Sequence, residues 1–379
     1  SVIKEPKLGC NGLMFELIRL VCTHNDDELY IPPDNVYILT GMANKEWENT
    51  IRKDCPDIIR ENVHHRPMVP KIISDIKGKK NLLLIIDEID VATKAKKNNQ
   101  QIMHKALEAA GILDIEYMRE NNVRIVAISA TNCKEMRAMK KFGCEYADVY
   151  KMTKPDEYFG VQDMSDMGIL KQAPPITSVL QMKKFITKNG IEHFGENDPR
   201  VHMIRGDKNT RQFVKDACDK LNIEMYDHFG IEEKKSHKEL LDICLNVKKH
   251  CVIFLKNMFG RADFIPNEMK VKIGFWLDKS VKEKTRNANV QLQAGIGRMS
   301  GFWKSLLDSH KLGYIFTDLN SVREYISFYN NPSLAKVKCH KCDPILQPKY
   351  VKNAKEVIEV SRDGNYLLEK RGDDAFRVY

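Results

Sequence analysis

The sequence has no long hydrophobic run. Its longest unbroken aliphatic stretch, residues 82–86, is far shorter than the roughly 18 residues that a membrane-spanning helix needs. The chain also starts without a signal-peptide pattern, and its ten cysteines are scattered instead of spaced as a disulfide framework. We therefore expect no membrane segment and an intracellular protein of the cytoplasm or nucleus, not a secreted one.

No single residue type dominates the composition. Hydrophobic residues make up 42% and charged residues 30% of the chain, which is typical of globular proteins. A length of 379 residues exceeds one typical domain and suits two of roughly 150 residues each. The net charge of +9 favours a polyanionic partner, but a merely basic surface explains it equally well because the basic residues are spread along the chain.

The first 160 residues alternate apolar runs with longer polar segments. The runs at 36–39, 81–86 and 124–128 are continuously apolar, apart from Asn81 and Arg124 at the start of the last two, which predicts strands buried on both faces of a parallel sheet. The segments 45–52 and 102–120 between them are long enough to be crossover helices. This alternation predicts an α/β fold.

A second alternation follows a stretch that is rich in glycine and proline. The later predicted elements are strands at 201–205, 251–255, 271–277 and 314–317, with helices at 210–221, 237–247, 290–299 and 321–329. No sequence repeat links the two halves. We expect an N-terminal lobe (1–160), a linker (161–177), a C-terminal lobe (178–331) and a basic tail (332–379), each lobe being an open, mostly parallel sheet flanked by helices.

Two acids, Asp87 and Glu88, directly follow the strand at 81–86. Parallel sheets bind ligands at the carboxyl ends of their strands. Asp87 could hold Mg²⁺, usually through water, and Glu88 could orient a hydrolytic water toward a γ-phosphate. Acids also follow strands simply because strands end at the surface. Asp90 adds a further alternative, a metal-dependent nuclease, although additional acids are missing at convincing positions.

A second motif, Ser129-Ala130-Thr131, ends the next strand. Alone it is a commonplace turn. Here it stands at the end of the strand that follows the strand ending in Asp87 and Glu88. This order of motifs resembles the arrangement in superfamily-two helicases, whose core consists of two RecA-like lobes. The resemblance implies that the hydroxyls of Ser129 and Thr131 tie the acid pair to the nucleic-acid side of the lobe.

A third match lies in the predicted helix 290–299. Gln293, Gly297 and Arg298 resemble the last motif of the same family, a helix that faces the nucleotide. The resemblance makes Arg298 an arginine finger, whose delocalised charge suits a phosphoryl transition state; the alternative is an ordinary surface arginine. The spacing within the motif resembles a variant found among viral and phage-like helicases, and Arg261 resembles a basic loop of those proteins.

The candidate phosphate-binding loop consists of four residues just before a predicted helix at 13–21: Gly9, Cys10, Asn11 and Gly12. Its position suits an anion at a helix N-terminus. The family expects Gly-Lys-Thr or Gly-Lys-Ser, with the lysine bridging the β- and γ-phosphates and the hydroxyl on Mg²⁺, but Cys10 and Asn11 occupy those places. Lys4 and Lys7 precede the turn, so we expect neither to replace the lysine.

Candidate contacts to DNA or RNA phosphates lie at strand ends and in basic segments: Thr40, Gly41, Arg66, Ser129, Thr131, Arg205 and Arg261. Each alone is equally well explained as a solvated surface residue. Trp47, Trp276 and Trp303 could stack on bases, but tryptophans in apolar runs are more often core. Cys339 and Cys342 have zinc-knuckle spacing without a second pair.

The resemblance implies two possible functions. The first is a motor that binds ATP and Mg²⁺ between its lobes, hydrolyses the ATP and moves on or unwinds DNA or RNA. The second is a helicase-like protein that binds nucleic acid or has a structural role, and has lost turnover. Asp87, Glu88 and Arg298 favour the first function, whereas Cys10 and Asn11 favour the second and predict little or no hydrolysis.

Overall fold

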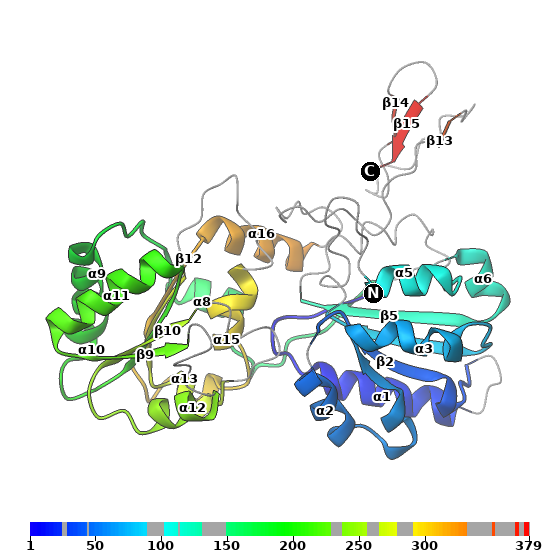
Figure 1. Cartoon of the computed structure of the whole chain (residues 1–379), viewed down its shortest axis with the longest axis horizontal. Coiled ribbons are helices and arrows are strands. Elements are labelled where there is room, and N and C mark those ends of the chain that lie inside the picture. The colour runs from blue at the N-terminus through cyan, green and yellow to red at the C-terminus, as the bar shows by residue number, and fades with distance from the viewer. Residues whose placement is uncertain are drawn as a thin grey trace.

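Two six-stranded sheets organise the chain. The computed structural model describes residues 1–24, 29–43, 45–88, 102–112, 114–130, 149–228, 237–255, 265–278, 291–331, 351–352, 368–370 and 375–378. Every strand pairing in the two sheets is parallel. Figure 1 shows the sheets as two lobes, one coloured blue to cyan and the other green to orange. The predicted fold class, two RecA-like α/β lobes, is confirmed.

The first sheet has the strand order β3-β2-β4-β5-β1-β6. Its strands are β1 Val2–Ile3, β2 Val36–Thr40, β3 Val63–His65, β4 Leu82–Asp87, β5 Val123–Ser129 and β6 Tyr150–Lys151. The three continuous apolar runs became β2, β4 and β5 in its centre. Strands β3 and β6 were not predicted, because an edge strand of two or three residues leaves no periodic signal.

Helices cover both faces of the first sheet. They are α1 Cys10–Thr23, α2 Lys45–Asp54, α3 Val69–Ile76, α5 Ile102–Ala109 and α6 Ile115–Glu120. Leu84 of β4 packs with α3 and α5, whereas its neighbour Leu83 packs with α1 and α2. Because successive strand residues point to opposite faces, burial of both faces explains the unbroken apolar run of β4.

The predicted helix at 102–120 is two helices. The chain turns at Gly111, where φ is +77°. Asp114 then caps α6 by accepting a hydrogen bond from the backbone N–H of Tyr117 at 3.0 Å. A glycine in the left-handed region followed by an aspartate N-cap ends one helix and starts the next.

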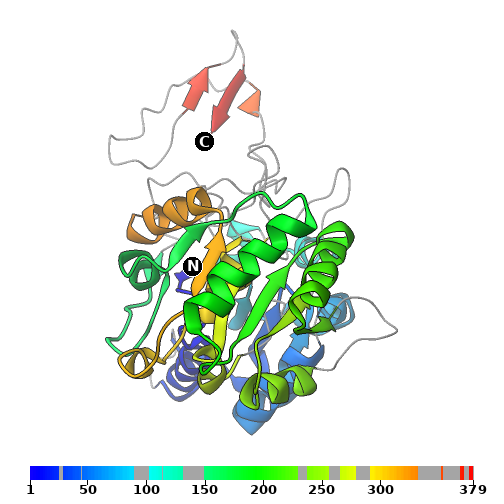
Figure 2. The ribbon, with the colours of Figure 1, turned by 90° about the vertical axis from the view of Figure 1, so that its left-hand side faces the viewer.

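The second sheet has the strand order β7-β12-β11-β8-β10-β9. Its strands are β7 Leu170–Gln172, β8 Val201–Arg205, β9 Glu224–His228, β10 Cys251–Leu255, β11 Ile273–Leu277 and β12 Tyr314–Thr317. The longer helices of this lobe are α8 Val161–Asp166, α9 Val179–Ile186, α11 Lys208–Leu221, α12 His237–Leu245 and α16 Leu319–Asn330. Figure 2 shows α9 and α11, in green, in front of the sheet, and α8, α12 and α16 pack on its other face.

The segment predicted as a linker, 161–177, contains two regular elements. Helix α8 buries Val161 and Met164 in the core of the second lobe. Strand β7 extends the second sheet, since Leu170 pairs with Ile315 of β12. The prediction of an irregular connection is wrong for these residues, because the glycines and prolines stand at turns around very short elements.

Shorter elements complete the description. They are the 3-10 turns η1 Pro33–Asn35, η2 Asp57–Asn62, η3 Arg66–Met68 and η8 Lys304–Leu306, the π-helical turns η5 Thr187–Ile191 and η7 Leu292–Ile296, and the short helices α10 Glu192–Phe194, α13 Asn267–Lys270 and α15 Gly297–Met299. In the predicted basic tail, β13 Val351–Lys352, β14 Leu368–Lys370 and β15 Ala375–Val378 form a small antiparallel sheet. Among the described helices, none has the length and apolar character to span a bilayer.

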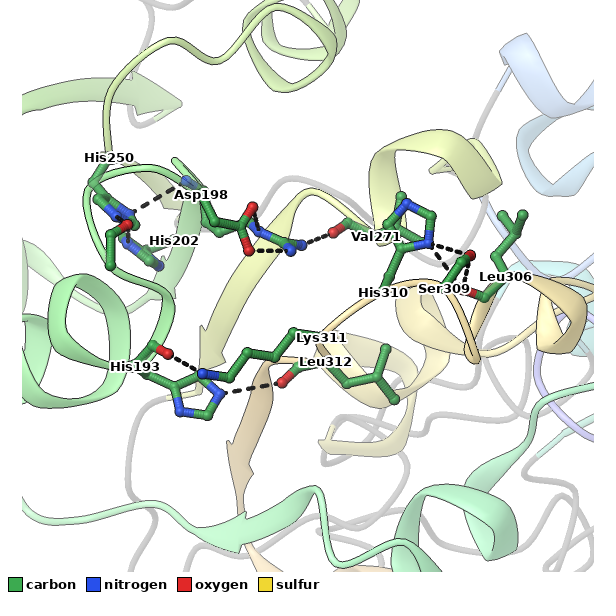
Figure 3. Close-up of polar contacts among 12 residues, drawn as sticks. His193, Asp198, His202, His250, Val271, Leu306, Ser309, His310, Lys311 and Leu312 are labelled. Atoms are coloured by element: carbon green, nitrogen blue, oxygen red, sulfur yellow. Dashed lines mark hydrogen bonds and ion pairs between the residues drawn. The ribbon is translucent and has the colours of Figure 1, made fainter.

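A pair of buried histidines lies in the second lobe (Figure 3). The Nε2 atom of His202 in β8 lies 3.2 Å from Nδ1 of His250, whose Nε2 lies 2.9 Å from the carbonyl oxygen of Gly195. Burial lowers the pKa of His202 well below its usual value, and the neighbouring His250 and Arg200 lower it further. His202 is therefore neutral in the folded protein at neutral pH.

Candidate functional site

The carboxyl ends of four strands meet at one edge of the first sheet. Thr40 at the end of β2 pairs with Asp87 at the end of β4. Asp87 pairs with Ile128 in β5, and Ser129 pairs with Ile3 of β1. This register aligns the acid pair with the start of the loop that leads into α1, at the edge where parallel α/β sheets bind ligands.

The carboxylate of Asp87 is buried and held by hydrogen bonds from neutral groups. The indole Nε1 of Trp47 lies 3.2 Å from Oδ2, and the backbone N–H of Glu88 donates to Oδ1 at 3.0 Å. The thiol of Cys10 lies 3.7 Å from the same Oδ1. Neutral donors orient the carboxylate without cancelling its charge, so it stays suited to a cation.

Glu88 is buried beside Asp87 in an unusual backbone conformation. Only 6% of its surface is exposed. Its φ of +51° lies in the left-handed region, which residues other than glycine, asparagine and aspartate rarely adopt. Such strain costs free energy and is concentrated at functional sites in known proteins.

The loop before α1 has a thiol where the family has a lysine. Gly9 has a φ of +87° and α1 begins at Cys10 without a side-chain cap. Asn11 is partly exposed and Gly12 is exposed in the first turn of α1. Burial, followed by the negative charge of Asp87, raises the pKa of the Cys10 thiol well above its usual value. The thiol is therefore protonated at neutral pH and can donate to Asp87.

Lys7 lies in the electrostatic field of the acid pair although it precedes the turn. Burial, followed by the charges of Arg298 and Lys4, lowers the pKa of its ammonium group to about 7, while Glu88 and Asp87 act in the opposite direction. Linear order, in which Lys7 precedes the turn, led us to expect no role for it. A signal was available, since Lys7 and Arg298 are basic residues in the segments that flank the nucleotide in the family.

Arg298 reaches this region from the second lobe. It lies in α15 and only 1% of its surface is exposed. A Cβ atom built on the preceding Gly297 would lie 3.5 Å from the Cβ of Pro6, so the helix closely approaches the loop before α1. Burial lowers the pKa of Lys270 to about 8, and the positive charge of Arg298 is the second cause of this shift. Gln293 lies in η7, but its side chain is outside the described residues.

The loop before α1 also bonds directly to the second lobe. The hydroxyl of Tyr158 donates to the carbonyl oxygen of Pro6, and the backbone N–H of Val161 donates to the Glu5 carboxylate at 3.0 Å. Ile3 packs within the apolar core of the second lobe. The segment 3–6 is therefore part of both lobes.

Thr40 and Gly41 make hydrogen bonds within the first lobe. The Thr40 hydroxyl is fully buried and accepts from the backbone N–H of Met42 at 3.2 Å. The N–H of Gly41 donates to the carbonyl oxygen of Asp87 at 2.9 Å. These groups hold the ends of β2 and β4 together in the structure.

The other predicted nucleic-acid contacts are dispersed. Ser129 is buried at the end of β5, Arg66 is partly exposed in η3, and the Nε atom of Arg205 donates to Asp278 at 3.0 Å. Several predicted residues lie outside the described residues: Asp90, Thr131, Arg261, Cys339 and Cys342. The three tryptophans are buried, as expected of core residues.

A complete metal cage is absent from the described part of the chain, where no three histidine, cysteine, aspartate or glutamate side chains are grouped suitably. Mg²⁺ usually keeps several waters and is bound by one or two carboxylates together with substrate phosphates. The donor set around Asp87 fits that mode of binding.

Comparison with known proteins adds little. No family model matches the chain, and no curated protein matches it. One solved structure that matches is the Sulfolobus solfataricus SWI2/SNF2 ATPase core in complex with dsDNA, with 12% sequence identity over 83% of this chain and 82% of that chain and a TM-score of 0.28. The two parallel sheets described above, not this distant similarity, establish the fold.

Proposed function

We propose that the chain binds Mg²⁺–ATP between its lobes and couples that binding to a grip on DNA or RNA, as a superfamily-two helicase core does. The supporting observation is that the strand register aligns Asp87 with the loop before α1, and that Gly297, next to Arg298 in the second lobe, lies against Pro6 of the same loop. An acid pair and an arginine from two lobes are the parts that phosphoryl transfer requires.

Each residue has a distinct role in this proposal. Asp87, oriented by Trp47 and Cys10, holds the Mg²⁺, which would neutralise phosphate charge. Glu88 orients a water toward the γ-phosphate, and Arg298 stabilises the charge that develops there. Backbone N–H groups of the first turn of α1, the loop residues Gly9 to Gly12, bind phosphate oxygens.

Nucleic acid is the partner that suits a basic chain with this fold. The net charge of +9 favours contacts to phosphates, which make affinity depend steeply on salt and little on sequence. We expect the affinity for single-stranded DNA or RNA to fall at least tenfold between 50 and 200 mM salt. Salt-insensitive association, measured by fluorescence anisotropy, would contradict a phosphate grip.

A second candidate function, binding without turnover, is favoured by Cys10. Its protonated thiol stands beside Asp87, where a loop lysine would stabilise the departing phosphate. Losing such a contact costs about 4 kcal/mol in the transition state and slows hydrolysis about a thousandfold. We therefore expect nucleotide binding with little or no hydrolysis.

The test measures Mg²⁺–ATP binding and hydrolysis with and without nucleic acid. Glu88→Gln should leave binding in place, and Arg298→Met should weaken it, whereas the exposed Lys77→Met serves as the control. Cys10→Lys combined with Asn11→Thr should increase hydrolysis. The proposal is wrong if the unmodified chain binds neither Mg²⁺–ATP at millimolar concentration nor any polynucleotide at low salt. Rapid hydrolysis by the unmodified chain, abolished by Glu88→Gln, would show that the motor is intact.

A further inference from the structure

We propose that Lys7 replaces the missing loop lysine and binds the β- and γ-phosphates of the nucleotide jointly with Arg298. This inference rests on the proposed function, because it names the residue that holds the polyphosphate in the same site. It also reverses the expectation from the sequence, in which Lys7 stands on the wrong side of the turn.

The backbone of the loop makes a tight turn at Lys7. Lys7 has a φ of +63° and Gly9 a φ of +87°, and the N–H of Leu8 donates to the carbonyl oxygen of Glu5 at 3.3 Å. Glycine adopts left-handed φ values without cost, whereas lysine does not. A lysine held in this conformation indicates that its side chain, not its backbone, is what the site requires.

Contacts from both lobes fix the position of the loop. The N–H of Lys4 donates to the carbonyl oxygen of Ser129 at 3.4 Å, which ties the loop to the end of β5. On the other side, Tyr158 donates to the carbonyl oxygen of Pro6, and Gly297 approaches Pro6 closely enough that an added Cβ would be in contact. Lys7 therefore follows directly after a residue that lies against the arginine-bearing helix.

The charges around Lys7 suit a shared anion. The groups that act on it come from three elements: Lys4 after β1, Asp87 and Glu88 after β4, and Arg298 in α15. Lys7 is partly exposed and Arg298 is buried; desolvation, followed by repulsion from the positive charge of Arg298, lowers the pKa of Lys7 to about 7. A polyphosphate bound by Lys7 and Arg298 would replace their repulsion with attraction to one ligand.

Proton uptake is a measurable consequence of this arrangement. Above pH 7, Lys7 of the unliganded protein is mostly neutral, and a bound polyphosphate favours its charged form. Binding should therefore take up a proton above pH 7 and weaken by about tenfold for each pH unit between 7 and 9. Near pH 6, Lys7 is already protonated, so no proton should be taken up by it.

Isothermal titration calorimetry with a non-hydrolysable ATP analogue and Mg²⁺ tests the inference at pH 6, 7 and 8.5, in two buffers of different ionisation enthalpy. At pH 7, Lys7→Met should weaken binding tenfold or more. Lys7→Arg keeps a permanent positive charge, so it should retain binding and lose the pH dependence. The nucleotide and the buffer titrate alike in all samples. The difference in proton uptake between Lys7→Arg and the unmodified chain therefore comes from Lys7 alone. The exposed Lys77→Met is the matched control.

The outcomes separate this inference from the proposed function. If Lys7→Met binds the analogue as tightly as the unmodified chain while Arg298→Met does not, Lys7 has no phosphate role but the nucleotide site stands. If the unmodified chain binds no analogue at any pH, the proposed function itself fails. Urea unfolding of both Lys7 variants tests whether a loss of folding causes any weaker binding. Lys7→Arg supports the inference only if it still binds the analogue.

Discussion

The two lobes place the same pair of side chains at the carboxyl edge of their sheets but surround them differently. In the first lobe, the indole of Trp47 donates to Asp87 at 3.2 Å. In the second lobe, the indole of Trp276 donates to Asp278 at 3.1 Å. Asp278 also accepts from the guanidinium of Arg205, whereas the Cys10 thiol and the backbone N–H of Glu88, which also donate to Asp87, are neutral.

The different hydrogen-bond donors suggest different roles for the two carboxylates: a structural one for Asp278 and a ligand-binding one for Asp87. Asp278 is completely buried, and a buried charge needs a counter-charge close by. Arg205 supplies that counter-charge within the protein. The hydrogen bonds described for Asp87 come from donors that carry no charge, and Lys7 acts on the acid pair Asp87 and Glu88 together, so we expect Asp87 to accept a further cation such as Mg²⁺.

The largest expected effect comes from removing the counter-charge in the second lobe. Arg205→Met leaves the buried carboxylate of Asp278 uncompensated and should lower the free energy of unfolding by about 3 kcal/mol. Cys10→Ala in the first lobe should lower it by about 1 kcal/mol or less, because a thiol is a weak donor. Urea unfolding measures both variants, and equal losses would show that the two carboxylates do not differ in this way.

The tryptophans test whether the shared geometry serves different purposes. Trp47→Phe and Trp276→Phe each remove a hydrogen bond to a charged group and should each cost about 1.5–3 kcal/mol of stability. Only Trp47→Phe should also weaken the Mg²⁺ dependence of nucleotide binding, since Asp87 loses its orientation. If calorimetry shows the same change for Trp276→Phe, the distinction between the two edges is wrong.

The smallest expected effect concerns pH. Because the pKa of His202 is lowered in the folded protein, the unfolded chain binds a proton near pH 6.5 while the folded chain does not. Stability is therefore complete above about pH 6.5 and falls by about 1.4 kcal/mol for each pH unit below it. Burial also lowers the pKa of His64 in the first lobe, but less strongly.

Two variants compare these histidines. Phenylalanine removes the titration at either position, so His202→Phe should flatten the pH dependence of unfolding between pH 6.5 and 5 more than His64→Phe does. The measurement is the urea midpoint at several pH values. A steeper profile for His202→Phe than for the unmodified chain would contradict the assignment.

The sequence predicted those parts of the fold that depend on burial of long elements. Strands β2 and β4 are buried on both faces, so each appears as a nearly unbroken apolar run; β5 is partly buried at residues 124–126 but keeps the run 125–128, and Asp87 marks the end of β4. Strands β7 and β9 were missed because edge strands lack that burial on both faces. Their existence depends on pairing with β12 and β10, which is a tertiary effect.

The candidate site was only partly predictable for a similar reason. Asp87, Glu88 and Arg298 belong to motifs with a recognisable spacing, and spacing is visible in a sequence. Lys7 reaches the site through a left-handed backbone and through contacts with the second lobe, neither of which linear order encodes. The donors to Asp87 from Trp47 and Cys10 likewise depend on the packing of α1 and α2 against the sheet.

The attachment of segment 3–6 to both lobes has a mechanical consequence. Phe159 and Gly301 exchange backbone hydrogen bonds of 2.8 and 3.0 Å, and Gly160 lies so close to Glu5 that a side chain there would overlap the carboxylate. Because Glu5 and Pro6 are held by the second lobe, a rotation of that lobe should displace the peptide that leads into α1. We therefore expect the angle between the lobes and the position of Lys7 to change together, so that a ligand which fixes one also restricts the other.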